Sequence, residues 1–73
     1  MKRLNTNLIN WTVACVNEFA RNCMLSPRDA FRYLYTYGGI EFLKNHYESE
    51  HLLSLDDTVE DLLIVCRSNG GSQ

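Results

Sequence analysis

A chain of 73 residues is the size of one small domain, and its 45% hydrophobic and 22% charged residues exclude an intrinsically disordered protein. A domain of this size buries only about 60% of the surface that its unfolded chain exposes, so a typical ligand pocket of about 300–1,000 Å³ would take up much of its core. These limits favour a binding or regulatory protein, and we predict that the protein is not an enzyme.

The net charge of −2 hides an uneven distribution of charge along the chain. Residues 1–40 carry five basic and two acidic side chains, whereas residues 41–61 carry one basic and seven acidic side chains. The acidic half disfavours nucleic acid, whose phosphates need a basic face, and suits a basic protein partner. The alternative is an acidic helix surface that only faces water. Our candidate interaction surface consists of six acidic residues and one tryptophan: Glu48, Glu50, Asp56, Asp57, Glu60, Asp61 and Trp11.

The cysteines and the N-terminal residues bear on the cellular compartment. Cys15, Cys23 and Cys66 are odd in number and far apart in sequence, which is typical of free thiols in a reducing cytoplasm. Lys2 and Arg3 precede an apolar run, but asparagines interrupt that run, unlike the core of an export signal. No stretch approaches the roughly 20 apolar residues of a membrane span. We therefore predict a cytoplasmic protein without a membrane partner.

The first predicted helix covers residues 6–23, where small or apolar side chains recur every three or four residues. Trp11 lies off that stripe, so it is either an exposed interface anchor or a cap on the edge of the bundle. The predicted buried stripe is Ile9, Val13, Val16, Ala20 and Cys23, with Leu8, Cys15 and Phe19 beside it.

The second predicted helix covers residues 27–37. Ser26 is a typical N-cap, Pro27 suits the first helical position, and Asp29 completes a capping box. The alternation of Phe31, Tyr33, Tyr35 and Tyr37 would also suit a strand, but Leu34 and the cap favour a helix. Gly38 and Gly39 are expected to end it.

Two further helices are predicted at residues 40–48 and 55–68. The last begins at the cap Ser54, buries the stripe Leu55, Val59, Leu62 and Cys66, and ends at Gly70 and Gly71. The predicted fold class is all-α, a compact bundle of about four short helices at residues 6–23, 27–37, 40–48 and 55–68. One domain spans residues 1–73, with frayed ends at residues 1–4 and 69–73.

The stretch NHYESEHLLS, residues 45–54, concentrates proton-transfer and metal-binding groups. His46 and His51 are five residues apart, so one helix would point them in different directions, and we predict no metal site and no cofactor. The structural interpretation is that Tyr47 closes the third helix onto the core and that His51 hydrogen-bonds a neighbouring carbonyl. The remaining route to catalysis, Cys23 or Cys66 paired with a histidine, is disfavoured because both thiols lie on apolar stripes.

A family resemblance adds a functional expectation. The segments YGGIEFL at 37–43, HY at 46–47, VEDL at 59–62 and CRSNGG at 66–71, with Glu50, His51, Leu53 and Ser54 between them, resemble a family of small bacterial proteins of unknown function. The likeness runs from about residue 8 to residue 71. It implies a neighbouring gene for an ADP-ribosyltransferase-like protein, and so an antitoxin-like protein that binds this partner. It implies no catalytic or ligand residues.

The alternative function is a small DNA-binding regulator with a helix-turn-helix. The helix pair within residues 26–47 is the candidate for that motif, with Arg28 and Arg32 facing phosphates. Glu41 and the acidic run follow closely, which favours the protein-interaction hypothesis over this one.

Overall fold

The computed structural model describes residues 6–73, and five helices make up most of that range. No strand occurs among these residues, so the predicted all-α class is confirmed. None of their helices is long and apolar enough to cross a membrane. The predicted frayed end at residues 1–4 lies outside the described residues. The helices are α1 at Thr6–Cys23, α2 at Pro27–Thr36, α3 at Gly39–Asn45, α4 at Tyr47–Glu50 and α5 at Leu55–Ser68.

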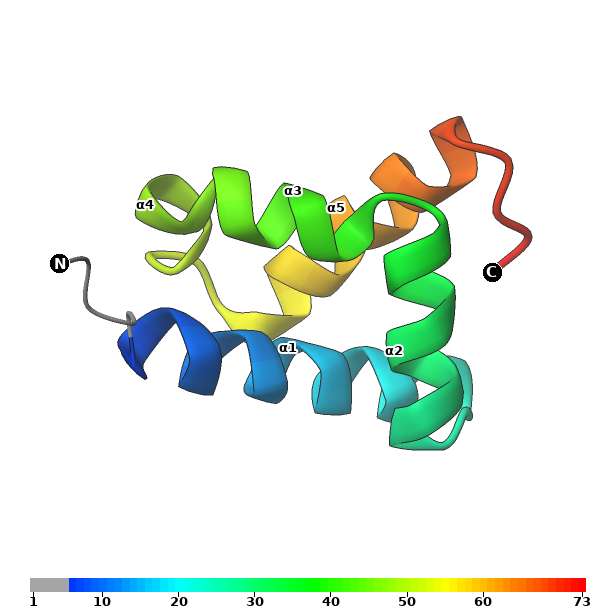
Figure 1. Ribbon diagram of the computed structural model, residues 1–73, viewed down its shortest axis with the longest axis horizontal. Coiled ribbons are helices and arrows are strands. Elements are labelled where there is room, and N and C mark those ends of the chain that lie inside the picture. The colour runs from blue at the N-terminus through cyan, green and yellow to red at the C-terminus, as the bar shows by residue number, and fades with distance from the viewer. Residues whose placement is uncertain (1–5) are drawn as a thin grey trace, which may run out of the picture.

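The helices form a small bundle in which α1 and α3 run along opposite sides of the molecule and α2 joins them at one end (Figure 1). The last helix, α5, passes behind α3 and packs against both α1 and α3. Because α1 also contacts α2, a single core lies between the four longer helices. That core consists of Cys15, Val16, Phe19, Ala20, Ala30, Leu34, Leu43, Val59, Leu62 and Cys66.

The predicted third helix at residues 40–48 is instead two helices, because the chain leaves helical geometry at His46 (φ −119°, ψ 24°). The break redirects α4 toward two other elements. The Tyr47 ring packs edge-on against Trp11 of α1, with ring centroids 5.3 Å apart. The Glu50 carbonyl accepts a 3.4 Å hydrogen bond from the Thr58 hydroxyl of α5.

The buried face of α1 differs from the prediction. Ile9 and Val13, predicted to be buried, are 47% and 54% exposed, whereas Cys15 and Phe19, predicted to lie beside the stripe, are fully buried. The reason is the position of the neighbouring elements. Trp11 packs on α4, so the helix is rotated and its Cys15–Phe19 side faces the core.

Serine caps fix the starts of α2 and α5 as predicted. The hydroxyls of Ser26 and Ser54 each accept a 3.1 Å hydrogen bond from the backbone N–H three residues on. Glycines in the left-handed conformation follow α2 and α5, at Gly38 (φ 84°) and Gly70 (φ 99°). These signals explain why the predicted boundaries of α2 and α5 agree with the structure to within one residue.

Removing the second of these caps gives a direct stability test. Ser54→Ala is expected to lower the free energy of unfolding by about 1 kcal/mol, because the Asp57 N–H then loses its acceptor. The control is Ser72→Ala in the exposed tail, which should leave the urea midpoint unchanged. Equal midpoints for the two variants would show that the cap does not stabilise α5.

The C-terminal tail, predicted to be frayed at residues 69–73, is held by hydrogen bonds. The Gln73 N–H donates to the Tyr33 hydroxyl of α2 at 3.0 Å, and Asn69 Nδ2 donates to the carbonyl of Tyr37, the residue that follows α2, at 2.8 Å. Arg67 Nε also donates to the Gln73 carbonyl at 2.8 Å. The polar, glycine-rich composition of the tail predicted fraying, because composition does not show the hydrogen bonds to Tyr33 and Tyr37, which are distant in sequence.

Candidate binding surface

The two histidines of the stretch 45–54 are exposed and serve separate local roles. His46 lies at the break between α3 and α4, and its ring packs on Phe42 with centroids 4.7 Å apart. His51 ends α4; its Nδ1 lies 2.6 Å from the Tyr47 carbonyl, and its ring stacks on the Tyr47 ring at 4.4 Å. Each side chain therefore packs on the residue four positions before it, and the structure does not bring them together as one site.

Metal-binding and thiol chemistry have little support in the described part of the chain. No group of three or more His, Cys, Asp and Glu side chains among residues 6–73 is placed to hold a metal ion. Burial raises the pKa of the Cys15 thiol to about 12 and also raises the pKa values of Cys23 and Cys66. Because the thiolate is the nucleophile, these shifts hold the three cysteines in their less reactive form.

Three acids of the candidate interaction surface, Asp56, Asp57 and Glu60, are exposed on the outer side of α5. We call these three residues the α5 acidic face. None of them forms an ion pair with another described residue. Ile64 is 62% exposed and lies one helical turn beyond Glu60, so it adds an apolar side chain to the same side of the helix. Glu48 is also exposed, but on α4.

Glu50 differs from the prediction that it belongs to an exposed surface. Glu50 is only 8% exposed, and its Oε1 has no hydrogen-bond partner among the described residues. Burial, and then the hydrogen bond and negative charge of the half-buried Asp61, raise the pKa of Glu50 to about 7, although Thr58 acts in the opposite direction. The break at His46 is the physical reason, because it turns α4 so that Glu50 faces α5.

Trp11 is half-buried in the structure. The T-shaped contact between its ring and Tyr47 attaches α4 to α1. Of the two interpretations left open by the sequence, this geometry favours the cap on the edge of the bundle. Tyr47, predicted to close the third helix onto the core, is likewise half-buried and packs on Trp11 rather than deep in the core.

The sequence reasoning missed an exposed aromatic pair on α2. Phe31 and Tyr35 are 48% and 71% exposed, and their rings stack with centroids 6.2 Å apart. Arg28 and Arg32 are exposed on the same side of the helix and form no ion pair with another described residue. The aromatic residues alternate as they would in a strand, which obscured a second pattern. Residues 28, 31, 32 and 35 are three or four positions apart and therefore lie on one face of a helix.

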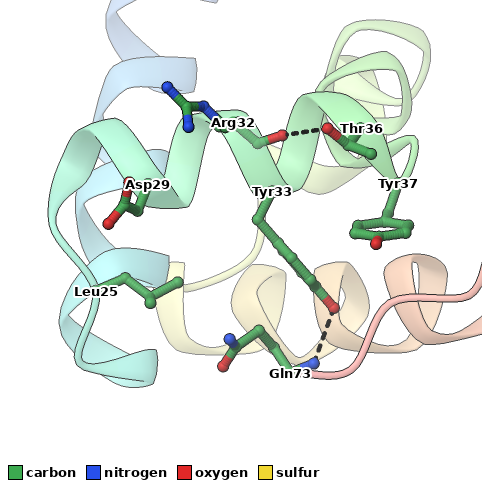
Figure 2. Close-up of a pocket in the computed structure, with 7 residues that line it drawn as sticks. All are labelled: Leu25, Asp29, Arg32, Tyr33, Thr36, Tyr37 and Gln73. Atoms are coloured by element: carbon green, nitrogen blue, oxygen red, sulfur yellow. Dashed lines mark hydrogen bonds between the residues drawn. The ribbon is translucent and has the colours of Figure 1, made fainter.

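A groove of about 380 Å³ lies between α2 and the C-terminal tail. Figure 2 shows the Tyr33 side chain crossing from α2 to the tail, where its hydroxyl meets Gln73. Asp29 and Arg32 contribute one charge of each sign, so the groove favours neither an anionic nor a cationic ligand. Its lining residues are Leu25, Asp29, Arg32, Tyr33, Thr36, Tyr37 and Gln73.

Comparison with known proteins places the chain in a family without assigning an activity. A family model described as protein of unknown function (DUF3791) matches residues 10–69. The chain belongs to the DUF3791 family. No curated protein and no solved structure matches the chain.

The DUF3791 match covers most of the described residues but leaves out the first turn of α1 and the tail after Asn69. It begins inside α1 just before Trp11 and ends at Asn69, the C-cap of α5. The α5 acidic face, the Glu50–Asp61 pair and the aromatic face of α2 therefore all lie within the DUF3791 domain. Gln73, which closes the groove beside Tyr33, lies outside the matched residues.

Proposed function

We propose that this DUF3791 protein is a non-enzymatic protein-interaction module that binds a basic partner protein through the α5 acidic face. The observation that carries the proposal is the exposure of Asp56, Asp57 and Glu60 on one side of α5, without an ion pair to any other described residue. Exposed carboxylates can pair with lysines and arginines of another protein.

The apolar neighbour of the α5 acidic face supports an interface rather than a merely solvated surface. Ile64 is 62% exposed although it is large and apolar. Specific interfaces commonly combine an apolar centre with a charged rim. In this arrangement the carboxylates raise the association rate with a basic surface, and Ile64 contributes the area that is removed from water on binding.

The proposed partner is the product of a neighbouring gene, an ADP-ribosyltransferase-like protein, to which this chain would bind as an antitoxin-like protein in the bacterial cytoplasm. The support is the resemblance to small bacterial proteins encoded beside such enzymes, together with the acidic helix. A bound inhibitor needs a complementary surface and no catalytic residues of its own.

Charge reversal on α5 tests the proposal. Glu60→Lys is expected to weaken binding to the adjacent gene product about tenfold at low salt and to reduce the dependence of the association rate on salt, because steering between opposite charges is lost. The control Glu41→Lys makes the same charge change on the exposed side of α3. A titration by surface plasmon resonance at two salt concentrations distinguishes the variants. Equal weakening by both, or by neither, would contradict the α5 acidic face as the binding site.

The second candidate is DNA binding by the α2–α3 pair, favoured by the exposure of Arg28 and Arg32 on one side of α2. The seven-residue α3 would then be the recognition helix, but it carries Glu41 in its first turn. A mobility-shift assay with mixed-sequence duplex DNA at moderate salt tests this candidate. A shift that disappears with Arg28→Glu and Arg32→Glu would favour it over the protein-binding function.

A further inference from the structure

Glu50 is the most unusual polar group in the described chain. It lies on the four-residue α4, it is 8% exposed, and its Oε1 is buried without a hydrogen-bond partner in residues 6–73. Buried polar groups in proteins almost always have partners, and a buried carboxylate without a cation is especially costly. No ion pair to Glu50 occurs within residues 6–73. A buried carboxyl group avoids most of this cost when it holds a proton and is neutral.

The groups around Glu50 favour its neutral form. The titratable side chains that act on it or respond to it are Asp61 of α5 and the Cys15 thiol of α1. The Thr58 hydroxyl of α5 is the polar neighbour that favours the ionised form. Two carboxyl groups can share a hydrogen bond only when one of them holds a proton, so the closeness of Asp61, which raises the pKa of Glu50, favours a protonated acid.

We propose that Glu50 and Asp61 form a proton-dependent latch, in which the singly protonated pair holds α4 against α5 and ionisation of Glu50 releases α4. In the closed state Glu50 keeps its proton, and its carboxyl O–H donates a hydrogen bond to the Asp61 carboxylate. Loss of that proton leaves two negative charges in contact at the edge of the core, where repulsion and desolvation both oppose the closed state. The latch does not depend on the proposed docking function.

Because α4 is weakly attached, its release from α5 is the smallest structural change that separates the Glu50 and Asp61 carboxylates. One hydrogen bond, of 3.4 Å, joins Thr58 of α5 to the Glu50 carbonyl, and the Trp11–Tyr47 ring contact joins α4 to α1. The following linker gives little support, because Leu52 and Leu53 are 77% and 42% exposed. Segments with few buried apolar contacts open at a lower free energy than the global unfolding of the domain.

The direction of the effect follows from the pKa values of Glu50. Its pKa is raised from 4.5 to about 7, first by burial and then by Asp61, so between these two pH values the folded protein holds a proton that the unfolded chain has lost. The stabilisation from this proton is therefore complete below pH 4.5 and is lost as the pH rises through about 7. The latch is closed at mildly acidic pH and open at mildly alkaline pH.

Fluorescence of Trp11 tests the latch directly, because it is the only tryptophan in the chain and its ring packs against Tyr47 of α4. The native protein is expected to show a reversible change in emission with a midpoint near pH 7, with helical circular dichroism nearly unchanged. Glu50→Gln keeps the shape of the side chain and can still donate a hydrogen bond to Asp61, so its emission should stay at the acidic value from pH 5.5 to 8.5.

Histidine variants separate this latch from a histidine-based change, since histidines titrate in the same pH range. His46→Gln and His51→Gln are expected to retain the transition, whereas Asp61→Asn should move its midpoint to lower pH by removing the like charge beside Glu50. A transition that persists in Glu50→Gln, or that disappears in either histidine variant, would overturn the latch.

If Glu50→Gln does not fold, a measurement on the native protein still tests the latch. Carboxyl ¹³C NMR of glutamate-labelled native protein should show one resonance that titrates with the same midpoint as the Trp11 emission. If every glutamate carboxyl titrates below about pH 5.5, Glu50 is ionised in the folded protein at neutral pH and the latch is contradicted.

Discussion

Leu62→Ala is expected to lower the free energy of unfolding by about 2–5 kcal/mol and to leave the domain barely folded at 37 °C. Leu62 lies in the middle of α5 with no exposed surface, in the core that α5 shares with α1 and α3. Truncation to alanine removes buried apolar surface and leaves a cavity that the rest of the core fills only in part. The loss is large against the total of about 5–15 kcal/mol that is typical of such domains.

Urea unfolding followed by circular dichroism at 222 nm measures the effect of Leu62→Ala. Ile64→Ala is the matched control, because Ile64 is an aliphatic residue of the same helix that is 62% exposed. It should change the free energy of unfolding by about 0.5 kcal/mol or less. If Ile64→Ala proved the more damaging change, the buried side of α5 would be assigned to the wrong face.

Phe19→Ala is expected to destabilise the domain by about 3–5 kcal/mol, the range typical of a buried phenylalanine. Phe19 has no exposed surface, and its ring stacks on Tyr33 of α2 with centroids 5.7 Å apart. The variant therefore loses core volume and a contact that joins α1 to α2. Thermal unfolding should show a fall of well over ten degrees, since about 1 kcal/mol corresponds to 4–8 °C in a domain of this size.

The comparison that matters for Phe19 is with Val13 on the same helix. Val13 is 54% exposed, so Val13→Ala should leave the melting temperature within a few degrees of the native value. The apolar stripe predicted from the sequence buries Val13 and has Phe19 beside it, so it predicts that Val13→Ala also destabilises the domain. A larger effect at Val13 than at Phe19 would support that stripe and contradict the orientation of α1 in the structure.

Most of the fold was predictable because the helix ends carry local signals. Ser26 and Ser54 cap helices, and Gly38 and Gly70 adopt left-handed conformations that glycine tolerates best. The end of α1 is closed in the same way by Met24 (φ 57°), a residue that rarely adopts this conformation. There the apolar pattern alone placed the end correctly at Cys23.

The buried face of α1 and the position of the C-terminal tail were not predictable, because both depend on contacts between residues distant in sequence. The apolar residues of α1 cover more than half of its circumference, so spacing alone cannot choose which of them face the core. The contact of Trp11 with Tyr47, 36 residues later, fixes that choice. Similarly, nothing local indicates that the Tyr33 hydroxyl accepts a hydrogen bond from Gln73.

The sequence predicted the exposed acids of α5 but not the burial of Glu50. The exposed acids of α5 follow directly from helical periodicity, because they lie opposite the stripe that contains Val59 and Leu62. Glu50 was placed with them by its charge alone. Its burial depends on the break at His46, for which the sequence carries neither a proline nor a glycine as a signal.

Mapping the bound surface by NMR is the most direct test of the proposed function. Backbone amide shifts of ¹⁵N-labelled protein would be followed during titration with the unlabelled proposed partner, an ADP-ribosyltransferase-like product of a neighbouring gene. We predict saturable binding, with the largest changes on α5 around Asp57, Glu60 and Ile64. Absence of binding, or changes confined to the Arg28–Tyr35 side of α2, would contradict a protein-interaction module that binds its partner through the α5 acidic face.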